Sequence, residues 1–299
     1  MAQRHVVVLG GTGFVGRHLV ARLLQGGNRV TVLSRGLDPA KRPLRPQGAS
    51  LIEGDVSDAD FLAAVLDDAD AVVNLVGILN EKGDRGDGFE QVFVGITDAL
   101  IQAMTRMGVR RLLQMSALNA GRGESHYLQA RGRAEQRVRI SGLDWTLFRP
   151  SVIAGPGDGL FCRFDELLRF APVLPIGRAE AKFQPVWVGD VVEAFARALD
   201  EPRSIRETYD LVGPDVMTLR EIVRLSARAR GRHRMVLGLS PALGRLQAGV
   251  GEWLPGKPIS RDNWRSLQLD SVSFEDGLRR IGVTPTPVEP KVAEILAGC

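Results

Sequence analysis

Tyr127 and Arg131 are two residues whose types and spacing could support proton-transfer chemistry. They stand four positions apart in the segment YLQAR (127–131), and four positions on a helix place two side chains on the same face. A cation beside a phenol stabilises the phenolate, so such a pair could serve as a general acid or base. The alternative is a surface helix that carries both side chains without a catalytic role.

The segment LGGTGFVGRHL (9–19) has the spacing of a dinucleotide-binding turn. Gly10, Gly13 and Gly16 lie where a short apolar run passes into a helical pattern, and they allow a tight turn, a close backbone approach to a pyrophosphate and close helix–strand packing. Backbone N–H groups at the positive start of the helix would meet the phosphates, and a threonine hydroxyl is a further donor. A purely structural strand–helix turn is the alternative. The predicted cofactor contacts at this turn are Gly10, Thr12, Gly13, Phe14, Val15 and Gly16.

Ser34 and Arg35 end the second strand pattern, at the position that selects between NAD(H) and NADP(H). An NAD-preferring dehydrogenase usually has an acidic residue there, whereas a guanidinium can hold a ribose 2′-phosphate through two hydrogen bonds. The sequence therefore predicts NADP(H), with NAD(H) as the second choice; an exposed strand-end charge is the alternative interpretation of Arg35. Further predicted cofactor contacts follow the third and fourth strand patterns, namely Asp55, Val56, Leu75, Val76 and Gly77.

Alternating strand and helix patterns would position these residues. Short apolar runs rich in β-branched residues alternate with segments of helical periodicity through the first half of the chain, which predicts an α/β fold with a Rossmann-type, doubly wound parallel sheet. The strand patterns cover residues 5–10, 29–35, 50–55, 71–77, 110–117 and 144–153, and the helical patterns cover 14–27, 58–67, 89–107 and 127–141.

The alternation loosens after residue 155, which predicts a second part of different organisation. Residues 1–155 are expected to form the dinucleotide-binding domain, with a returning strand and helix near 182–200. Residues 156–299 are expected to form a smaller, mixed C-terminal region on the substrate or partner side. Within it, Thr218 and Glu221 have the spacing of a helix capping box.

A basic segment and an apolar segment follow each other in this C-terminal region. Residues 220–234 carry six arginines, and residues 240–256 carry leucine, valine and tryptophan at helical spacing. We favour the interpretation in which the arginines are solvated and the apolar stripe closes a substrate pocket. The alternative is a surface that rests on an acidic partner or an anionic membrane.

The composition is that of an ordinary globular protein of 299 residues, with a net charge of +4. The arginines are spread along the chain, so nucleic acid is not an expected partner. Cys162 and Cys299 are unrelated in position, and we expect neither a disulfide nor a metal site from them or from the four scattered histidines. Neither a signal peptide nor a membrane span is expected, which predicts a cytoplasmic location, with the inner face of a membrane as the alternative.

Taken in order along the chain, these motifs resemble the extended and atypical short-chain dehydrogenase/reductases. The resemblance is carried by GGTGFVG (10–16), GD (54–55), MSALNA (115–120), YLQAR (127–131), FRPSVIAGPGD (148–158) and KFQPVWVGDVVEAFARAL (182–199). More narrowly, SGLDWTLFRPSVIAGPGD (141–158) and ISRDNWRSLQLDSV (259–272) are similar to the branch that holds the dinucleotide-binding accessory subunit of mitochondrial complex I and its bacterial relatives.

The resemblance implies roles for individual residues. Ser116 would polarise a substrate carbonyl, and Tyr127 would be the general acid or base. The backbone at Pro150, Ser151 and Val152 would lie against the nicotinamide.

Three residues depart from the pattern of active family members. Arg131 replaces a lysine that binds the nicotinamide ribose, and its planar fork is bulkier than an ammonium group. Ala117 replaces a second hydroxyl, and Phe93 replaces an asparagine that helps to hold the geometry of the active-site helix. These three changes affect the groups that would transfer a proton and leave the predicted cofactor-binding residues in place. We therefore expect Tyr127 to pack against the cofactor or to form a hydrogen bond with it without catalysing its reaction.

Two function classes follow. The preferred one is a cofactor-holding structural, assembly or sensing protein, linked by resemblance to respiratory or quinone machinery. The alternative is an active NADPH-dependent oxidoreductase on an apolar carbonyl or quinone-like substrate. The expected partners are a nicotinamide dinucleotide and, by resemblance, a respiratory complex or a membrane surface.

Overall fold

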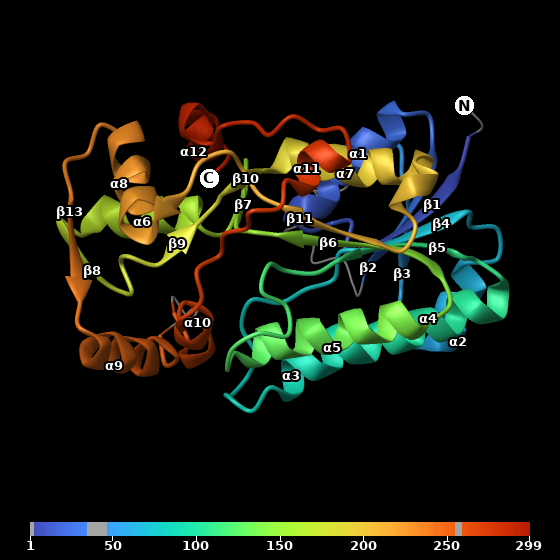
Figure 1. The fold of residues 1–299 in the computed structure, drawn as a ribbon, viewed down its shortest axis with the longest axis horizontal. Helices are drawn as coiled ribbons and strands as arrows, with labels where there is room; N and C mark the ends of the chain where they lie inside the picture. Colours follow the sequence, from blue (N-terminus) through green and yellow to red (C-terminus); the bar gives the residue numbers. More distant parts are fainter. Residues whose placement is uncertain (1–2, 35–46, 255–258) are drawn as a thin grey trace.

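Seven parallel strands form the main sheet of the protein (Figure 1). The structure is a computed structural model and describes residues 3–34, 47–254 and 259–299. The strand order is β11-β6-β5-β4-β1-β2-β3, and every neighbouring pair is parallel, which confirms the predicted Rossmann-type sheet. The strands are β1 (His5–Leu9), β2 (Arg29–Ser34), β3 (Ser50–Glu53), β4 (Ala71–Asn74), β5 (Arg111–Met115), β6 (Asp144–Pro150) and β11 (Glu207–Leu211).

Helices cover both faces of this sheet, because its central strands are apolar on both sides. Val6 and Val8 of β1 pack toward α1 and α7, whereas Val7 and Leu9 pack toward α2, α4 and α5. Figure 1 shows the two helical layers on opposite sides of the strands. The helices of the first layer are α1 (Phe14–Gln25), α7 (Val188–Asp200) and α11 (Gly277–Arg280), and those of the second are α2 (Ala59–Val65), α3 (Asp87–Phe89), the π-helical segment η2 (Glu90–Gly95), α4 (Ile96–Met107) and α5 (His126–Ile140).

A smaller group of helices and two-stranded sheets lies beside the main sheet, at the end of the molecule remote from the N-terminus (Figure 1). Its β8 and β13 are parallel, and α8 begins with the predicted capping box between Thr218 and Glu221. The helices of this group are α6 (Phe161–Phe170), α8 (Leu219–Ala229), α9 (Pro241–Gly251), α10 (Arg261–Ser266) and α12 (Val292–Ala297), with a 3-10 turn at Glu289–Lys291. A further 3-10 turn, Pro202–Ser204, contacts α7 and β11 and belongs to the main sheet. The short strands are β7 (Ile153–Ala154), β8 (Val173–Gly177), β9 (Lys182–Phe183), β10 (Val186–Trp187), β12 (Met217–Thr218) and β13 (Met235–Leu239).

The strand that returns to the main sheet is β11. Residues 182–187, which read as one strand in the sequence, form β9 and β10 in two separate small sheets. Pro185 lies between them and has no N–H group to donate to a ladder, so the run cannot continue as one strand. The helix expected after this run is present as α7 and packs against α1.

The apolar stripe of α9 does not close a pocket, contrary to the interpretation favoured from the sequence. Its large apolar side chains are exposed, and its small residues face inward. The elements that α9 packs against leave room only for glycine and alanine on its buried face. The spacing of the large apolar residues in the sequence does not show which face of the helix is buried.

The two cysteines form a disulfide, so the expectation of unpaired thiols was wrong. Cys162 lies in α6 and Cys299 follows α12, with 5.3 Å between their Cα atoms. A sequence separation of 137 gives no local sign of this contact, which depends on the packing of α12 against α6. No helix in the described ranges has both the length and the apolar character needed to cross a bilayer.

Candidate functional site

The glycine turn between β1 and α1 has the geometry expected of a phosphate-binding loop. Gly10 has a φ of +78°, which disfavours other residues, and its carbonyl oxygen accepts a hydrogen bond from Gly13 N at 3.0 Å. A Cβ at Gly16 would lie 2.2 Å from the Gly10 carbonyl oxygen, so only glycine permits this close approach of helix and loop. No side chain of the described residues caps α1, which leaves N–H groups of its first turn directed out of the helix.

The space beside Gly13, on the side where a Cβ would stand, is nearly free of atoms from the part of the chain that the structure describes. A Cβ at Gly13 would have only the Gly10 carbonyl oxygen within 4 Å among the described residues, so the other directions are open. Phe14 and Val15 begin α1 at this point, and Thr12 lies within the turn. The residues predicted to hold a dinucleotide phosphate are therefore together in a turn shaped for an anionic group.

The other predicted cofactor residues follow neighbouring strands at the same edge of the sheet. Because β3, β2, β1 and β4 are adjacent and parallel, their carboxyl ends lie side by side, and β1 is the point where the strand order reverses. Leu75 is close to the glycine turn, with its carbonyl carbon 3.1 Å from where a Cβ of Gly10 would stand. Val76 and Gly77 continue from Leu75.

At the far side of this edge, Ser34 ends β2 and its carbonyl oxygen accepts a hydrogen bond from Gly54 N. The carboxylate of Asp55 accepts hydrogen bonds from the backbone N–H and the hydroxyl of Ser57, and Val56 is buried. Arg35, on which the cofactor preference depends, lies outside the described residues.

Arg131 lies one turn after Tyr127 on α5, as the spacing predicted. Its side chain is only 6% exposed, and its Nη1 donates a hydrogen bond to the Met115 carbonyl oxygen at 2.8 Å. The guanidinium carbon is 3.9 Å from the centre of the Phe93 ring and 5.5 Å from that of Tyr127. Arg131 is thus held by an aromatic face and a carbonyl oxygen, while its buried Nε has no hydrogen-bond partner within the described part of the chain.

Two of the three departures from the family pattern, Phe93 and Arg131, are explained by one contact between their side chains. Phe93 lies in the π-helical segment η2, and its ring also packs edge-on against Tyr127, with 5.4 Å between ring centres. A planar guanidinium stacks on an aromatic face more favourably than a compact ammonium does. The aromatic residue at position 93 and the arginine at position 131 therefore form one packing unit.

Ser116 is committed to a partner that the sequence did not indicate. Its hydroxyl donates to Glu135 Oε1 at 2.6 Å, and Glu135 also accepts two hydrogen bonds from the Arg149 guanidinium. The hydrogen bonds that Arg149 donates to Glu135 raise the pKa of the Arg149 guanidinium. Ser116 and Glu135 are both buried, so this network keeps the serine hydroxyl proton directed at a carboxylate.

Asp262 is a second residue that sequence reasoning missed. This buried carboxylate comes from α10 and accepts hydrogen bonds from Ser125 Oγ and from the backbone N–H groups of His126 and Tyr127. It therefore satisfies free donors at the start of α5 and places a negative charge at the positive end of that helix. The segment ISRDNW was noted only for its family resemblance, and nothing in its spacing connects it to Tyr127.

The segment after β6 is held by the C-terminal region. Ser151 Oγ donates to the Ser271 carbonyl oxygen at 2.7 Å, and the carbonyl oxygen of Val152 accepts from Val186 N. The carbonyl oxygen of Pro150 accepts from Leu118 N, two residues after Ser116. Pro150 and Val152 thus lie at the carboxyl end of β6, at the sheet edge that carries the other predicted cofactor residues.

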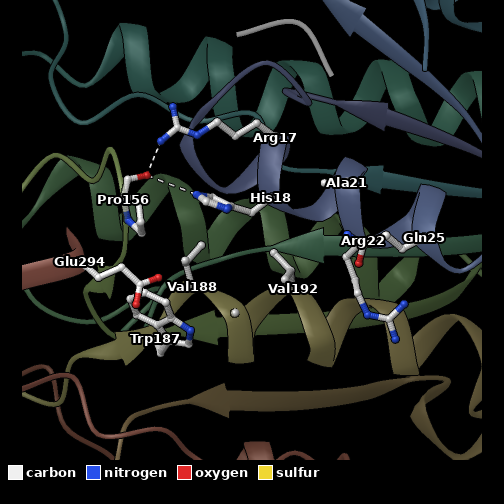
Figure 2. Close-up of a pocket in the computed structure, with 11 residues that line it drawn as sticks. Arg17, His18, Ala21, Arg22, Gln25, Pro156, Trp187, Val188, Val192 and Glu294 are labelled. Carbon is white, nitrogen blue, oxygen red and sulfur yellow. Dashed lines mark hydrogen bonds between the residues drawn. The ribbon is translucent and has the colours of Figure 1, made fainter. Parts of the chain in front are cut away.

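A separate pocket of about 390 Å³ lies between α1 and α7 (Figure 2). Arg17 and His18 both point at the Pro156 carbonyl oxygen, and burial lowers the pKa of His18. None of the predicted cofactor residues lines this pocket, so we do not equate it with the dinucleotide site. In the described ranges, no group of three or more histidine, cysteine, aspartate or glutamate side chains is arranged to hold a metal ion.

Comparison with known proteins agrees with this geometry. Residues 10–161 match a family model described as NAD(P)H-binding. The chain belongs to this NAD(P)H-binding family.

Its curated relatives include mitochondrial proteins named as subunits of NADH dehydrogenase (ubiquinone). The chain is 30% identical over 302 residues to the Rattus norvegicus mitochondrial protein NADH dehydrogenase (ubiquinone) 1 alpha subcomplex subunit 9, covering 97% of this chain and 78% of that one. It is 34% identical over 226 residues to the Arabidopsis thaliana protein of the same name, covering 73% of this chain and 56% of that relative's length. A ceramide reductase of Caulobacter vibrioides is 29% identical, over 82% of this chain and 76% of that one.

Solved structures share the fold. A Thermus thermophilus UDP-glucose 4-epimerase in complex with NAD superposes with a TM-score of 0.79 at 22% identity and covers 98% of both chains. A Streptomyces venezuelae dTDP-glucose 4,6-dehydratase superposes with a TM-score of 0.77 at 21% identity, so the chain shares the Rossmann-like fold of epimerases and dehydratases.

Proposed function

We propose that this protein binds NADP(H) and retains it as a structural, assembly or sensing component linked to respiratory or quinone machinery. The observation that carries this proposal is the packing of Arg131 between the Phe93 ring and the Met115 carbonyl oxygen. A buried guanidinium in these contacts is poorly suited to the ribose contact made by the family's lysine. The naming of two relatives as respiratory-complex subunits supports the link to that machinery.

In this proposal the residues bind and orient the cofactor. The glycine turn and the first N–H groups of α1 hold the pyrophosphate, Ser34 and Arg35 select the 2′-phosphate, and Tyr127 bonds to or packs on the nicotinamide end. When bound, the dinucleotide would supply hydride chemistry. The Ser116 hydroxyl is engaged elsewhere, because its proton is directed at Glu135.

The same proposal divides the chain as the sequence suggests. Residues 1–155, with the segment 182–200, form the cofactor domain, which β11 extends, and the remainder of residues 156–299 forms the partner side. The proposed cofactor contacts are the residues named in the glycine turn and at the ends of β2, β3, β4 and β6.

An active NADPH-dependent reductase of apolar carbonyls or quinones is the second candidate. Tyr127 is retained, half-buried at the start of α5, and a relative covering most of the chain is named a ceramide reductase. This observation favours an enzyme only if Tyr127 can exchange a proton with a bound substrate.

Two measurements distinguish these candidates. The first is the nucleotide content of protein purified without added cofactor, where we expect NADPH that exchanges slowly with free nucleotide. The second is stopped-flow oxidation of NADPH against quinones and apolar ketones, in wild type, Tyr127→Phe and Arg131→Lys.

We expect no substrate-dependent oxidation in any of the three proteins. Tyr127→Phe should weaken cofactor retention by about 0.5–1.5 kcal/mol, the net contribution of one hydrogen bond. A folded Gly13→Val protein, in which a β-branched side chain fills the pyrophosphate space, should bind no dinucleotide and serves as the control. Oxidation by wild type that disappears in Tyr127→Phe would establish the reductase instead.

A further inference from the structure

Helix α9 presents its large apolar side chains to solvent. Gly244, Ala248 and Gly251 form the buried face of the helix. An ordinary surface helix has the opposite arrangement, with its large apolar residues toward the core. The outward apolar side chains are 50–86% exposed and comprise Leu243, Leu246, Val250 and, just beyond the helix, Trp253 and Leu254.

The orientation of α9 is fixed by contacts that admit no larger side chain. A Cβ at Gly244 would lie 2.3 Å from the Trp264 ring, and one at Gly251 would lie 2.5 Å from the Ile259 carbonyl oxygen. Gln247 also bonds to the edge of β8, accepting from Gly177 N at 3.0 Å. The helix therefore cannot rotate to bury its apolar stripe without losing this packing.

Neighbouring strands add to the exposed apolar surface at this end of the molecule. β13 leads directly into α9, and the exposed residues of β8 and β13 include Val173, Met235 and Leu237. Figure 1 shows α8, β8, β13 and α9 together at the end remote from the N-terminus. We call the exposed apolar residues of β8, β13, α9 and the two positions after α9 the apolar end surface. Its members are Val173, Met235, Leu237, Leu243, Leu246, Val250, Trp253 and Leu254.

This surface is bordered by positive charge. Between positions 224 and 254 the sequence contains six arginines and a single acidic residue, Glu252. Glu252 is largely buried and faces Arg261, so its charge is compensated. Arg224 and Arg228 line a shallow pocket with Val173 and Met235. These two arginines and Arg245 take part in none of the ion pairs found among the described residues.

We propose that the apolar end surface lies on an anionic lipid bilayer, with α9 at the interface and Trp253 at the depth of the headgroups. Exposed apolar side chains enter the boundary between headgroups and acyl chains, and tryptophan favours that boundary. Arginines around them attract anionic headgroups. A second copy of this chain would instead bring like charges together across a two-fold axis, which disfavours self-association.

The proposal is tested by co-sedimentation of the full chain with vesicles of phosphatidylcholine alone or of phosphatidylcholine mixed with phosphatidylglycerol. We expect binding to the anionic vesicles that weakens with salt, and little binding to the neutral ones. Trp253 is far more exposed than the protein's other tryptophans, so its fluorescence should shift to shorter wavelength on binding. The shift should be absent in Trp253→Phe.

Matched variants distinguish binding through the apolar end surface from nonspecific adsorption through other exposed residues. Leu246→Ser with Val250→Ser should reduce vesicle binding about tenfold or more, because two apolar contacts with the bilayer are lost. Ile140→Ser with Phe274→Ser changes two apolar residues that are even more exposed but lie outside the apolar end surface, and should have no effect. Arg224→Gln, Arg228→Gln and Arg245→Gln together should weaken binding, whereas Arg106→Gln, Arg137→Gln and Arg279→Gln, which change the net charge equally elsewhere, should not.

Either of two results would overturn the proposal. One is wild-type protein that fails to bind anionic vesicles at low salt, or that binds them equally well after the Leu246 and Val250 changes. The other is a concentration-dependent dimer without lipid that buries Trp253, which would assign the apolar end surface to a second copy of the chain. Neither result bears on cofactor retention, so this test is independent of the proposed function.

Discussion

Arg131 has a charge that is stabilised by aromatic rings and a carbonyl oxygen. Its guanidinium lies 3.9 Å from the Phe93 ring centre and is almost fully buried. Such a contact is worth about 2 kcal/mol when it is desolvated. The sequence placed Arg131 correctly on the face of Tyr127, because four residues make one helical turn. It could not show that Phe93 would be the partner, because that contact joins two helical segments.

In the proposed function, the preference for NADP(H) over NAD(H) depends on one charge, at Arg35. We expect wild-type protein to bind NADPH more tightly than NADH, since a guanidinium can pair with the 2′-phosphate. Arg35→Ala should reduce the affinity for NADPH by about 1.5–3 kcal/mol and leave the affinity for NADH nearly unchanged. Calorimetric titration with both nucleotides measures this difference. Equal affinities in wild type, or a preference that persists in Arg35→Ala, would mean that another group selects the cofactor.

Glu135 shows why polar core residues escape sequence analysis. In a helical sequence pattern, Glu135 is expected to be a solvated charge. Its partners come from other elements, because Arg149 belongs to β6 and Ser116 follows β5. The first β-strand, the glycine turn and α1 could be predicted because apolar runs and glycine spacing are local signals. Pairings between distant elements have no such local signal.

Helix α5 depends on α10 for its start. Asp262 accepts three hydrogen bonds there through both carboxylate oxygens. In Asp262→Asn, one of these oxygens becomes an amide NH₂ group, which cannot accept a hydrogen bond from the donors at the start of α5. We expect the free energy of unfolding to fall by about 1–3 kcal/mol, and the dinucleotide to dissociate faster because Tyr127 begins this helix. Urea denaturation and nucleotide exchange kinetics measure the two effects.

Asp276→Asn provides a matched control. Asp276 is the N-cap residue of α11, where its carboxylate accepts a hydrogen bond from Arg279 N, so its replacement should lower stability without changing nucleotide exchange. If both variants changed the exchange rate equally, Asp262 would have no specific role in positioning α5.

Packing of α1 against the segment at Pro156 predicts a pH effect. Burial lowers the pKa of His18, so the folded protein keeps this ring neutral where the unfolded chain, with a pKa near 6.5, takes up a proton. The free energy of unfolding should therefore decrease as the pH falls below about 6.5. Urea midpoints measured between about pH 5.5 and 8 should show a smaller slope in His18→Gln than in wild type or in the exposed variant His233→Gln. An identical slope in all three would exclude His18 as the cause.

At the scale of the whole molecule, the sheet positions the glycine turn and the C-terminal elements position the residues around Tyr127. The dinucleotide-binding half could be predicted because its elements follow one another along the chain and repeat a known alternation. β11 could not be assigned to the sheet in advance. It is a five-residue strand that pairs with β6 across more than fifty intervening positions, and its ETYDL sequence has no long apolar run.

The disulfide between Cys162 and Cys299 should stabilise this whole arrangement by linking α6 to the end of α12. Cys162→Ser, Cys299→Ser and full reduction should each lower the free energy of unfolding by about 2–4 kcal/mol, because the unlinked chain gains freedom when it unfolds. The double variant should be no less stable than either single variant, since the same bond is lost in all three.

Denaturation with and without reductant measures these free energies of unfolding. Mass spectrometry of unreduced peptides should recover the segments around residues 162 and 299 as one disulfide-linked pair. Additive losses in the double variant, or wild-type stability that is insensitive to reductant, would show that the two thiols act separately and that α12 is held by packing alone.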